Sequence, residues 1–157
     1  MKQPYPFFIH FYKGERQILV VPSAKHIDGF RVHLDYYHKF PESVDSKNVG
    51  NSVLSMIEII KNSPLLSTTK NEIEEQSIWK KATKYKTYKS FCNNYLCVRI
   101  DFYENGEYRI IACERASERG GYSGCIKKFE LPATATTEEI GQAVLDAFKA
   151  AEDFYAE

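Results

Sequence analysis

Alternating apolar and polar positions dominate the first forty residues and predict strands. Residues 5–12 (YPFFIHFY) and 16–21 (RQILVV) are rich in β-branched and aromatic side chains. The short, glycine-containing stretch between them predicts a hairpin. Pro22 is expected to end the second strand, because proline has no N–H to give to a ladder. Residues 29–37 alternate again, which predicts a strand that is buried on one side.

The spacing of apolar residues then changes to three and four, which predicts helices. Residues 48–64 (NVGNSVLSMIEIIKNSP) follow this period and end at a proline. The last predicted helix lies in residues 134–157, where Thr136 and Glu139 form a capping box. Its apolar stripe would dock on a sheet. The stripe comprises Ile140, Val144, Phe148 and Ala151, with Ala147 and Tyr155 beside it.

A second hairpin is predicted over residues 96–115, with Asn105-Gly106 as a two-residue turn. That turn would place Ile111 and Cys113 on the core face with Val98 and Ile100, and would bring Arg99 near Glu114. A further strand is expected over residues 125–132. Because short turns join the strands, we expect an α+β fold: a largely antiparallel sheet with helices packed against it, in one domain spanning residues 1–157.

Charge is balanced overall but not along the chain. The 21 basic and 21 acidic residues give a formal net charge of zero, which argues against a duplex-binding domain. Residues 1–78 are neutral, residues 79–99 carry six basic groups and no acid, and residues 100–157 have an acidic excess of six. The uneven distribution indicates charged patches.

The basic stretch WKKATKYKTYKSF (residues 79–91) combines five lysines with four aromatic residues. A helix over residues 84–92 would turn Tyr85, Tyr88 and Phe91 inward and leave lysines in solvent, which is our preferred interpretation. A single-stranded nucleic-acid strip that also uses Tyr103 or Tyr108 is the alternative, since bases stack on exposed rings. Exposed Tyr85 and Tyr88 would favour that alternative. A membrane-surface helix fits less well, because the apolar face is short.

Motifs for catalysis, metals or cofactors are missing from the sequence. The four cysteines form no CxxC pair, and residues 118–124 (ERGGYSG) lack the GK[ST] of a phosphate loop, so no metal or cofactor is expected. Asp35 and His38 could serve a small hydrolase as orienter and base, which is a further alternative. The chain lacks the pattern of a signal peptide or a membrane span, so we expect a soluble, cytoplasmic protein.

Two stretches together resemble a known family. WKKATKYKTYKSF precedes a strand-rich middle, and ELPATATTEEIGQAVLDAF (residues 130–148) is similar to the "lp…t.eeLG.avl.al" ending of one family of bacterial contact-dependent growth inhibition (CDI) immunity proteins. Ile140 stands where the family pattern has Leu. The resemblance implies a Whirly-like fold and a non-enzymatic antidote that binds the C-terminal toxin domain of a cognate effector. Nucleic-acid binding would not follow from the fold.

The resemblance also implies a contact surface. If the toxin is a nuclease, its substrate groove is basic, and its inhibitor should present carboxylates and aromatic anchors. We therefore expect toxin contacts in the acidic segment before the basic stretch and at the end of the third strand. The candidate residues are Asp35, Tyr36, Tyr37, Glu72, Glu74 and Glu75.

Overall fold

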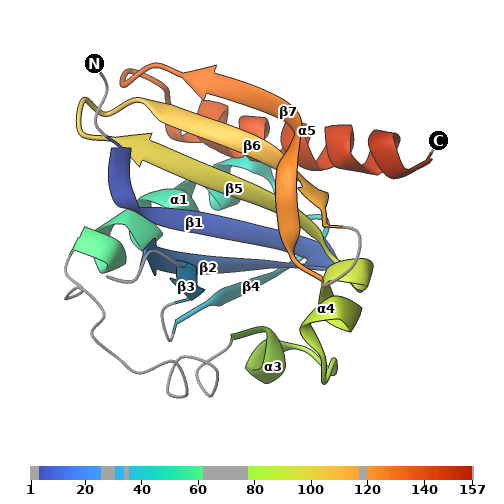
Figure 1. The fold of residues 1–157 in the computed structure, drawn as a ribbon. Coiled ribbons are helices and arrows are strands. Elements are labelled where there is room, and N and C mark those ends of the chain that lie inside the picture. Colours follow the sequence, from blue (N-terminus) through green and yellow to red (C-terminus); the bar gives the residue numbers. More distant parts are fainter. Residues whose placement is uncertain (1–3, 26–30, 34–35, 62–77, 117–119, 157) are drawn as a thin grey trace.

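A computed structural model describes residues 4–25, 31–33, 36–61, 78–116 and 120–156 of the chain (Figure 1). Its elements in chain order are β1 (Pro4–Gly14), β2 (Gln17–Lys25), β3 (Arg31–His33), β4 (His38–Pro41), α1 (Ser46–Lys61), α3 (Ile78–Ala82), α4 (Tyr88–Asn94), β5 (Leu96–Tyr103), β6 (Tyr108–Arg115), β7 (Tyr122–Leu131) and α5 (Thr137–Ala156).

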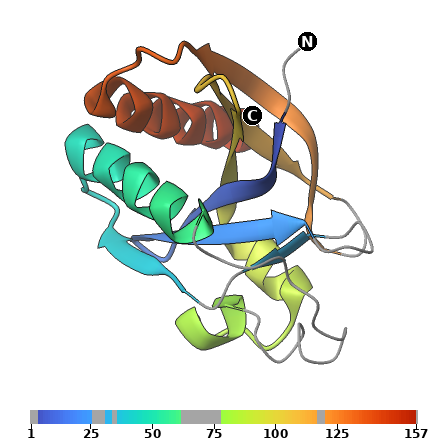
Figure 2. The same cartoon turned by 90° about the vertical axis from the view of Figure 1, so that its left-hand side faces the viewer.

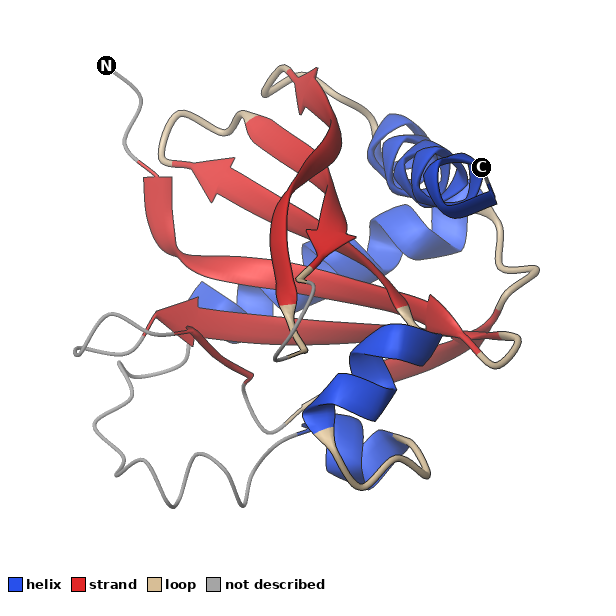
Figure 3. Cartoon of the chain, turned by 45° about the vertical axis from the view of Figure 1, so that its right-hand side comes forward, coloured by secondary structure: helices blue, strands red, loops and turns tan. Residues whose placement is uncertain are grey.

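The described strands form one antiparallel sheet in the order β3-β2-β1-β5-β6-β7, and β4 also pairs with β2. Two layers of helices flank it: α1 and α5 lie side by side on one face (Figure 2), and α3 and α4 lie together at one end of the other (Figure 3). The predicted α+β class with an antiparallel sheet is confirmed. The Whirly-like assignment stays a prediction.

Strand β2 runs through Pro22, so the prediction that proline ends it was wrong. The β1–β2 turn consists of Glu15 and Arg16, both with positive φ. In such a two-residue hairpin, alternate pairs exchange hydrogen bonds, starting next to the turn. Pro22 pairs with Ile9 at a rung without them, so its nitrogen faces away from β1. On that outer edge, the β4 ladder ends at Val20 and the β3 ladder begins at Ser23. Pro22 therefore occupies the gap, where a donor is not needed.

The β5–β6 hairpin exists, but its predicted register was off by one residue. Cys97 pairs with Cys113, and Ile100 pairs with Ile110. The loop has three residues instead of two: Gly106 N donates to Tyr103 O at 2.9 Å, and Gly106 has φ +88°. This is a type I turn followed by a left-handed glycine. A one-residue shift exchanges the faces of a strand, so Ile110 and Ala112 enter the core under α1 and α5, while Ile111 and Cys113 face the opposite side.

Other predicted boundaries shift modestly. The predicted strand over residues 29–37 is represented by β3, and the structure adds β4 after it. Helix α1 begins at Ser46 because Asp45 caps it, with Asn48 N donating to Asp45 Oδ1 at 2.9 Å. Strand β7 begins at Tyr122, three residues earlier than expected, and bulges at Gly124, where φ is +71°.

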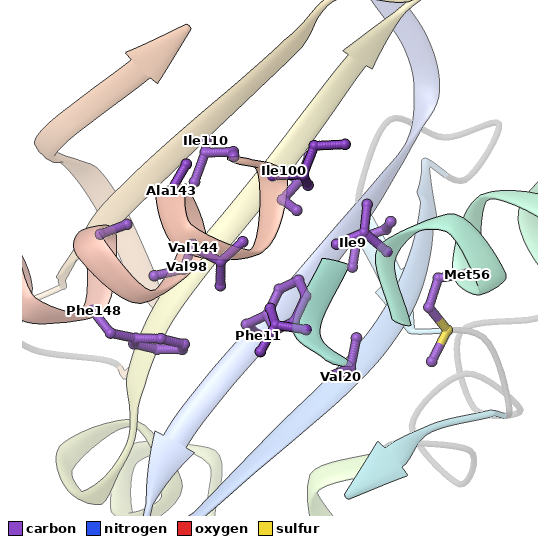
Figure 4. Close-up of a cluster of buried hydrophobic side chains, with 14 of the residues drawn as sticks. Ile9, Phe11, Val20, Met56, Val98, Ile100, Ile110, Ala143, Val144 and Phe148 are labelled. Carbon is purple, nitrogen blue, oxygen red and sulfur yellow. The ribbon is translucent and has the colours of Figure 1, made fainter. Parts of the chain in front are cut away.

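The first face of the sheet packs against α1 and α5 and forms the main core (Figure 4). Its side chains are almost entirely aliphatic, with Phe11, Phe102 and Phe148 as the aromatic members. The predicted stripe of α5 is buried as expected, including Ile140, Val144, Phe148 and Ala151. Burial of each large apolar side chain contributes roughly 1.5–3 kcal/mol, so this face holds the fold together.

The two helices of this layer touch at a pair of glycines. A Cβ atom at Gly141 in α5 would collide with the carbonyl oxygen of Ser46 in α1, and one at Gly50 would collide with the carbonyl oxygen of Thr137. The capping box beside this contact is confirmed. Thr136 N donates to Glu139 Oε1 at 2.9 Å, and Glu139 N donates to Thr136 Oγ1 at 3.2 Å. The hydrogen bond from Thr136 N to its carboxylate lowers the pKa of Glu139, and the Thr136 side chain adds to this effect. The start of α5 is thereby fixed against α1.

Candidate functional site

Tyr36, one of the predicted contact residues, is 40% exposed just before β4. Its hydroxyl lies 2.9 Å from Nε2 of His38, and the two rings meet edge to face at 5.2 Å. The other ring nitrogen of His38, Nδ1, lies 3.1 Å from Oγ of Ser52 in α1. Both contacts are satisfied when Nδ1–H donates to Ser52 and Nε2 accepts from Tyr36. Ser52 is only 3% exposed, so an exposed ring is tied to a core helix.

This arrangement does not resemble a hydrolase centre. The Ser52 hydroxyl is buried, so a substrate could not reach it, and both nitrogens of His38 are engaged. Asp35, the other residue of that hypothesis, lies outside the described residues. What the geometry does provide is a pre-oriented surface tyrosine, with an apolar ring and a polar tip.

Of the predicted toxin-contact residues, the structure describes Tyr36 and Tyr37. Tyr37 is half-buried and packs on the side of the sheet opposite α1, against the cluster formed by α3 and α4. Tyr36 and Tyr37 thus point to different sides of the β4 edge. Glu72, Glu74 and Glu75 lie outside the described residues, as Asp35 does. The support that His38 and Ser52 give to Tyr36 could not be read from the sequence, because Ser52 is distant along the chain.

The second face of the sheet carries an aromatic cluster under α3 and α4. Phe91 contacts four rings, with centroid distances of 4.8 Å to Tyr95, 5.1 Å to Tyr12, 6.0 Å to Trp79 and 6.2 Å to Tyr88. The hydroxyl of Tyr95 accepts from Gln17 Nε2 at 2.7 Å and donates to Glu15 Oε1 at 2.9 Å. Burial raises the pKa of Tyr95 to about 12. The cluster therefore joins the β1–β2 hairpin to α4.

The helix predicted over residues 84–92 begins later than expected. Helix α4 starts at Tyr88, because Thr87 caps it by accepting from Ser90 N. Phe91 and Cys92 face inward as predicted. Tyr85 is half-buried, with its ring edge to face with Tyr95, but Tyr88 is 38% exposed. The prediction that Tyr88 turns inward was wrong.

The nucleic-acid alternative named Tyr103 or Tyr108 as a further ring, and only Tyr103 shares a face of the sheet with α3 and α4, at the end of β5 far from α4. Tyr103 lies on the second face of the sheet, where Arg109 sits 5.8 Å from its ring, whereas Tyr108 packs against the main core on the first face. Rings on opposite faces of a sheet cannot form one stacking platform for a single strand.

A charged group occupies the second face beyond the aromatic cluster. Asp101, which is 4% exposed, accepts from Arg109 Nη2 at 2.8 Å and from Arg99 Nη2 at 3.1 Å. Nε of Arg99 also lies 2.8 Å from Oδ1 of Asp101. The predicted neighbour of Arg99 was Glu114, and the one-residue register shift explains why Asp101 and Arg109 stand opposite each other instead.

Among the described residues, no group of three His, Cys, Asp or Glu side chains is arranged to hold a metal ion. The cysteines there are free thiols, three of them buried. None of the described helices has the length and apolarity required to cross a bilayer.

Comparisons with known proteins identify the family. The CdiI family model, described as CDI immunity protein, matches residues 9–151. A protein of unknown function from Neisseria meningitidis has a similar structure, with TM-score 0.68, 20% identity and 94% of each chain covered. A chain of a CdiA-CT/CdiI toxin and immunity complex from Yersinia pseudotuberculosis gives TM-score 0.67 and 12% identity, covering 92% of this chain and 96% of that one. A search of curated sequences found no match.

The chain belongs to the CDI immunity protein family, because the family model spans nearly its whole length. The resemblance seen in the sequence is thereby confirmed. The chain is an immunity protein, and its partner is the cognate toxin domain of a contact-dependent growth inhibition system.

Proposed function

We propose that this chain neutralises its toxin by occlusion, without catalysis of its own, and that the toxin is a nuclease acting in the cytoplasm. The family match over residues 9–151 carries the proposal. It takes in both helical layers and the described sheet except the start of β1 and the end of α5, which supports a single immunity domain over residues 1–157. Such a protein acts by binding tightly and specifically to a surface of the toxin and burying it.

Tyr36 is the proposed anchor of that contact. Ordering a surface side chain on binding costs about 0.5–1.5 kcal/mol, and hydrogen bonding to His38 removes part of that cost beforehand. Aromatic anchors of this kind often dominate binding energy. The acidic residues Asp35, Glu72, Glu74 and Glu75, together with Tyr37, are proposed to complement a basic nuclease groove.

The first experiment uses the C-terminal toxin domain encoded by the effector gene directly upstream of this chain. Co-expression should rescue cells from that toxin, and calorimetry with a catalytically inactive toxin should give a complex. Failure of both rescue and binding would refute the proposed function. A Glu72→Lys/Glu75→Lys variant with unchanged affinity would remove the acidic segment from the interface.

Tyr36→Ala should raise the Kd of the toxin complex about 30-fold, equivalent to ~2 kcal/mol. His38→Ala should raise it about fivefold, because the ring of Tyr36 remains but loses its support. Phe154→Ala is the matched control, since Phe154 is a similarly exposed aromatic (43%) near the end of α5. Equal effects of Tyr36→Ala and Phe154→Ala would show that Tyr36 is not an anchor.

A further inference from the structure

The outer surface of α3, α4 and the segment between them carries five exposed lysines. They are Lys80, Lys81, Lys84, Lys86 and Lys89. Lys84 lies 3.4 Å from Glu15, and Lys80 lies 5.4 Å from the Trp79 ring centroid. Within the described part of the chain, neither Lys86 nor Lys89 forms an ion pair. The surface thus has a positive charge that the described protein only partly neutralises.

Tyr88 provides an apolar element beside these lysines. The residue is 38% exposed, and its ring centroid lies 5.8 Å from that of Trp79. The bend between β6 and β7 supports it from the side. A Cβ at Gly121 would touch Tyr88 Cε2 at 3.5 Å, and one at Gly120 would approach Lys89 Cα at 2.8 Å. Because Gly120 and Gly121 have positive φ, this bend can lie directly against the first turn of α4. The ring of Tyr88 and the backbone of Lys89 are therefore held in place by packing.

An acidic partner of this surface is either a nucleic acid or a protein, and the chemistry of the surface favours a protein. Protein surfaces that bind single-stranded nucleic acid present several aromatic rings with free faces for the bases. Tyr88 instead stacks on Phe91 with an interplanar angle of 18°. Residues 79–91 contain no arginine, the residue best suited to bidentate phosphate contacts. The chain also has no net positive charge to attract a polyanion. A packed tyrosine on the same short helical segment as exposed lysines suits a compact acidic surface.

We propose that the surface formed by Lys80, Lys86, Lys89 and Tyr88 docks an acidic region of the toxin domain. This inference rests on the proposed function and adds a second contact to it. The acidic segment at residues 72–75 immediately precedes α3 in sequence. The toxin would accordingly present a basic groove to one stretch and carboxylates to the next. Two contacts of opposite sign would fix the orientation of the complex and discriminate against toxins with a different charge pattern.

The decisive experiment reverses the charge of this surface. Lys86→Glu/Lys89→Glu should raise the Kd for the inactive toxin domain about 100-fold, because like charges would face each other across the interface. Lys47→Glu/Lys61→Glu, on exposed positions of α1, produces the same change in net charge and should change the Kd less than about threefold. Thermal denaturation of both variants checks that folding is retained. A zero-length carbodiimide cross-linker should also join Lys86 or Lys89 to toxin carboxylates in the wild-type complex.

The outcomes separate the two proposals. If wild type binds the toxin and both double variants bind equally well, the acidic docking is wrong and the proposed function stands. If wild type does not bind the toxin, both fall. If Lys86→Glu/Lys89→Glu abolishes binding to a single-stranded oligonucleotide at physiological salt but leaves toxin affinity unchanged, this surface recognises nucleic acid instead.

Discussion

The two faces of the sheet are built from different chemistry. The face under α1 and α5 is mostly aliphatic. Among the described residues, none of its buried core side chains is a tyrosine. The face under α3 and α4 combines Trp79, Phe91, three buried thiols and two buried tyrosines, Tyr12 and Tyr95. Helices α3 and α4 are also short, with five and seven residues, against 16 and 20 for α1 and α5.

The difference shows how stability and surface presentation can be divided within one sheet. Aliphatic packing is non-directional, so the first face depends mainly on how closely its side chains and helices fill the available volume. Each buried tyrosine hydroxyl needs a partner, so the second face depends on hydrogen bonds from several segments. Tyr122 donates to Tyr95 O at 2.7 Å, and Gln17 reaches Tyr95 from the β1–β2 hairpin. Such directional contacts fix two short helices and the lysines on them.

The largest effect should follow from closing the glycine contact on the first face. Gly141→Ala should destabilise the protein by about 3 kcal/mol or more, because the new methyl group would force α5 away from Ser46. In an ordinary helix the same change stabilises by about 1 kcal/mol. Urea denaturation followed by circular dichroism measures the difference. Ala150→Gly in the same helix is the control and should cost about 1 kcal/mol; a Gly141→Ala variant more stable than wild type would show that the helices can separate freely.

On the second face, Asp101→Ala should cost about 3 kcal/mol. The change leaves Arg99 and Arg109 next to each other without their shared carboxylate. Asp153→Ala breaks an exposed pair with Lys149 and should cost less than about 0.5 kcal/mol. Denaturant midpoints of both variants test this. A similar small loss for both would mean that water solvates the arginines well enough to replace Asp101.

A smaller effect should distinguish the faces by pH. Burial raises the pKa of Tyr12 well above its ordinary value. Because the unfolded chain loses this phenol proton more readily than the folded protein, the free energy of unfolding is unaffected by ionisation of Tyr12 below the unfolded pKa of about 10. It falls as the pH rises above that value. When the pH is raised from about 9 to about 11, the free energy of unfolding should therefore fall by about 1 kcal/mol less in Tyr12→Phe than in wild type.

The matched variant for this pH comparison is Phe148→Leu on the aliphatic face. It should lower stability by a similar amount at both pH values, because no titrating group is changed. Urea unfolding of the three proteins at both pH values gives the comparison. Parallel pH dependence in wild type and Tyr12→Phe would show that Tyr12 ionises without unfolding.

Local signals in the sequence were sufficient for the helices of the first face. The cap at Thr136 and Glu139 involves residues three apart, and the stripe of α5 follows from helical geometry alone. The β5–β6 register was missed because a two-residue and a three-residue turn share the same Asn105-Gly106 signal. The same one-residue error in register also gave the wrong partner for Arg99.

The candidate site was less predictable, since its contacts join distant segments. Tyr36 was identified by residue type, but its support from Ser52 depends on how α1 packs beside β4. The exposure of Tyr88 depends on the position of the Gly120–Gly121 bend, which comes from the β6–β7 connection. The start of α4 was missed because Thr87 competes with the apolar period as a start signal.

The interruption at Pro22 has an evolutionary consequence. Strand β2 offers its outer edge to two separate partners, β3 and β4, and the rung between them requires no hydrogen bond. The β3 and β4 ladders are therefore separate, and a change in one of them can leave the register of the other intact. An immunity protein that must match an altered toxin could thus change one half of this sheet edge while the rest of the sheet stays in register.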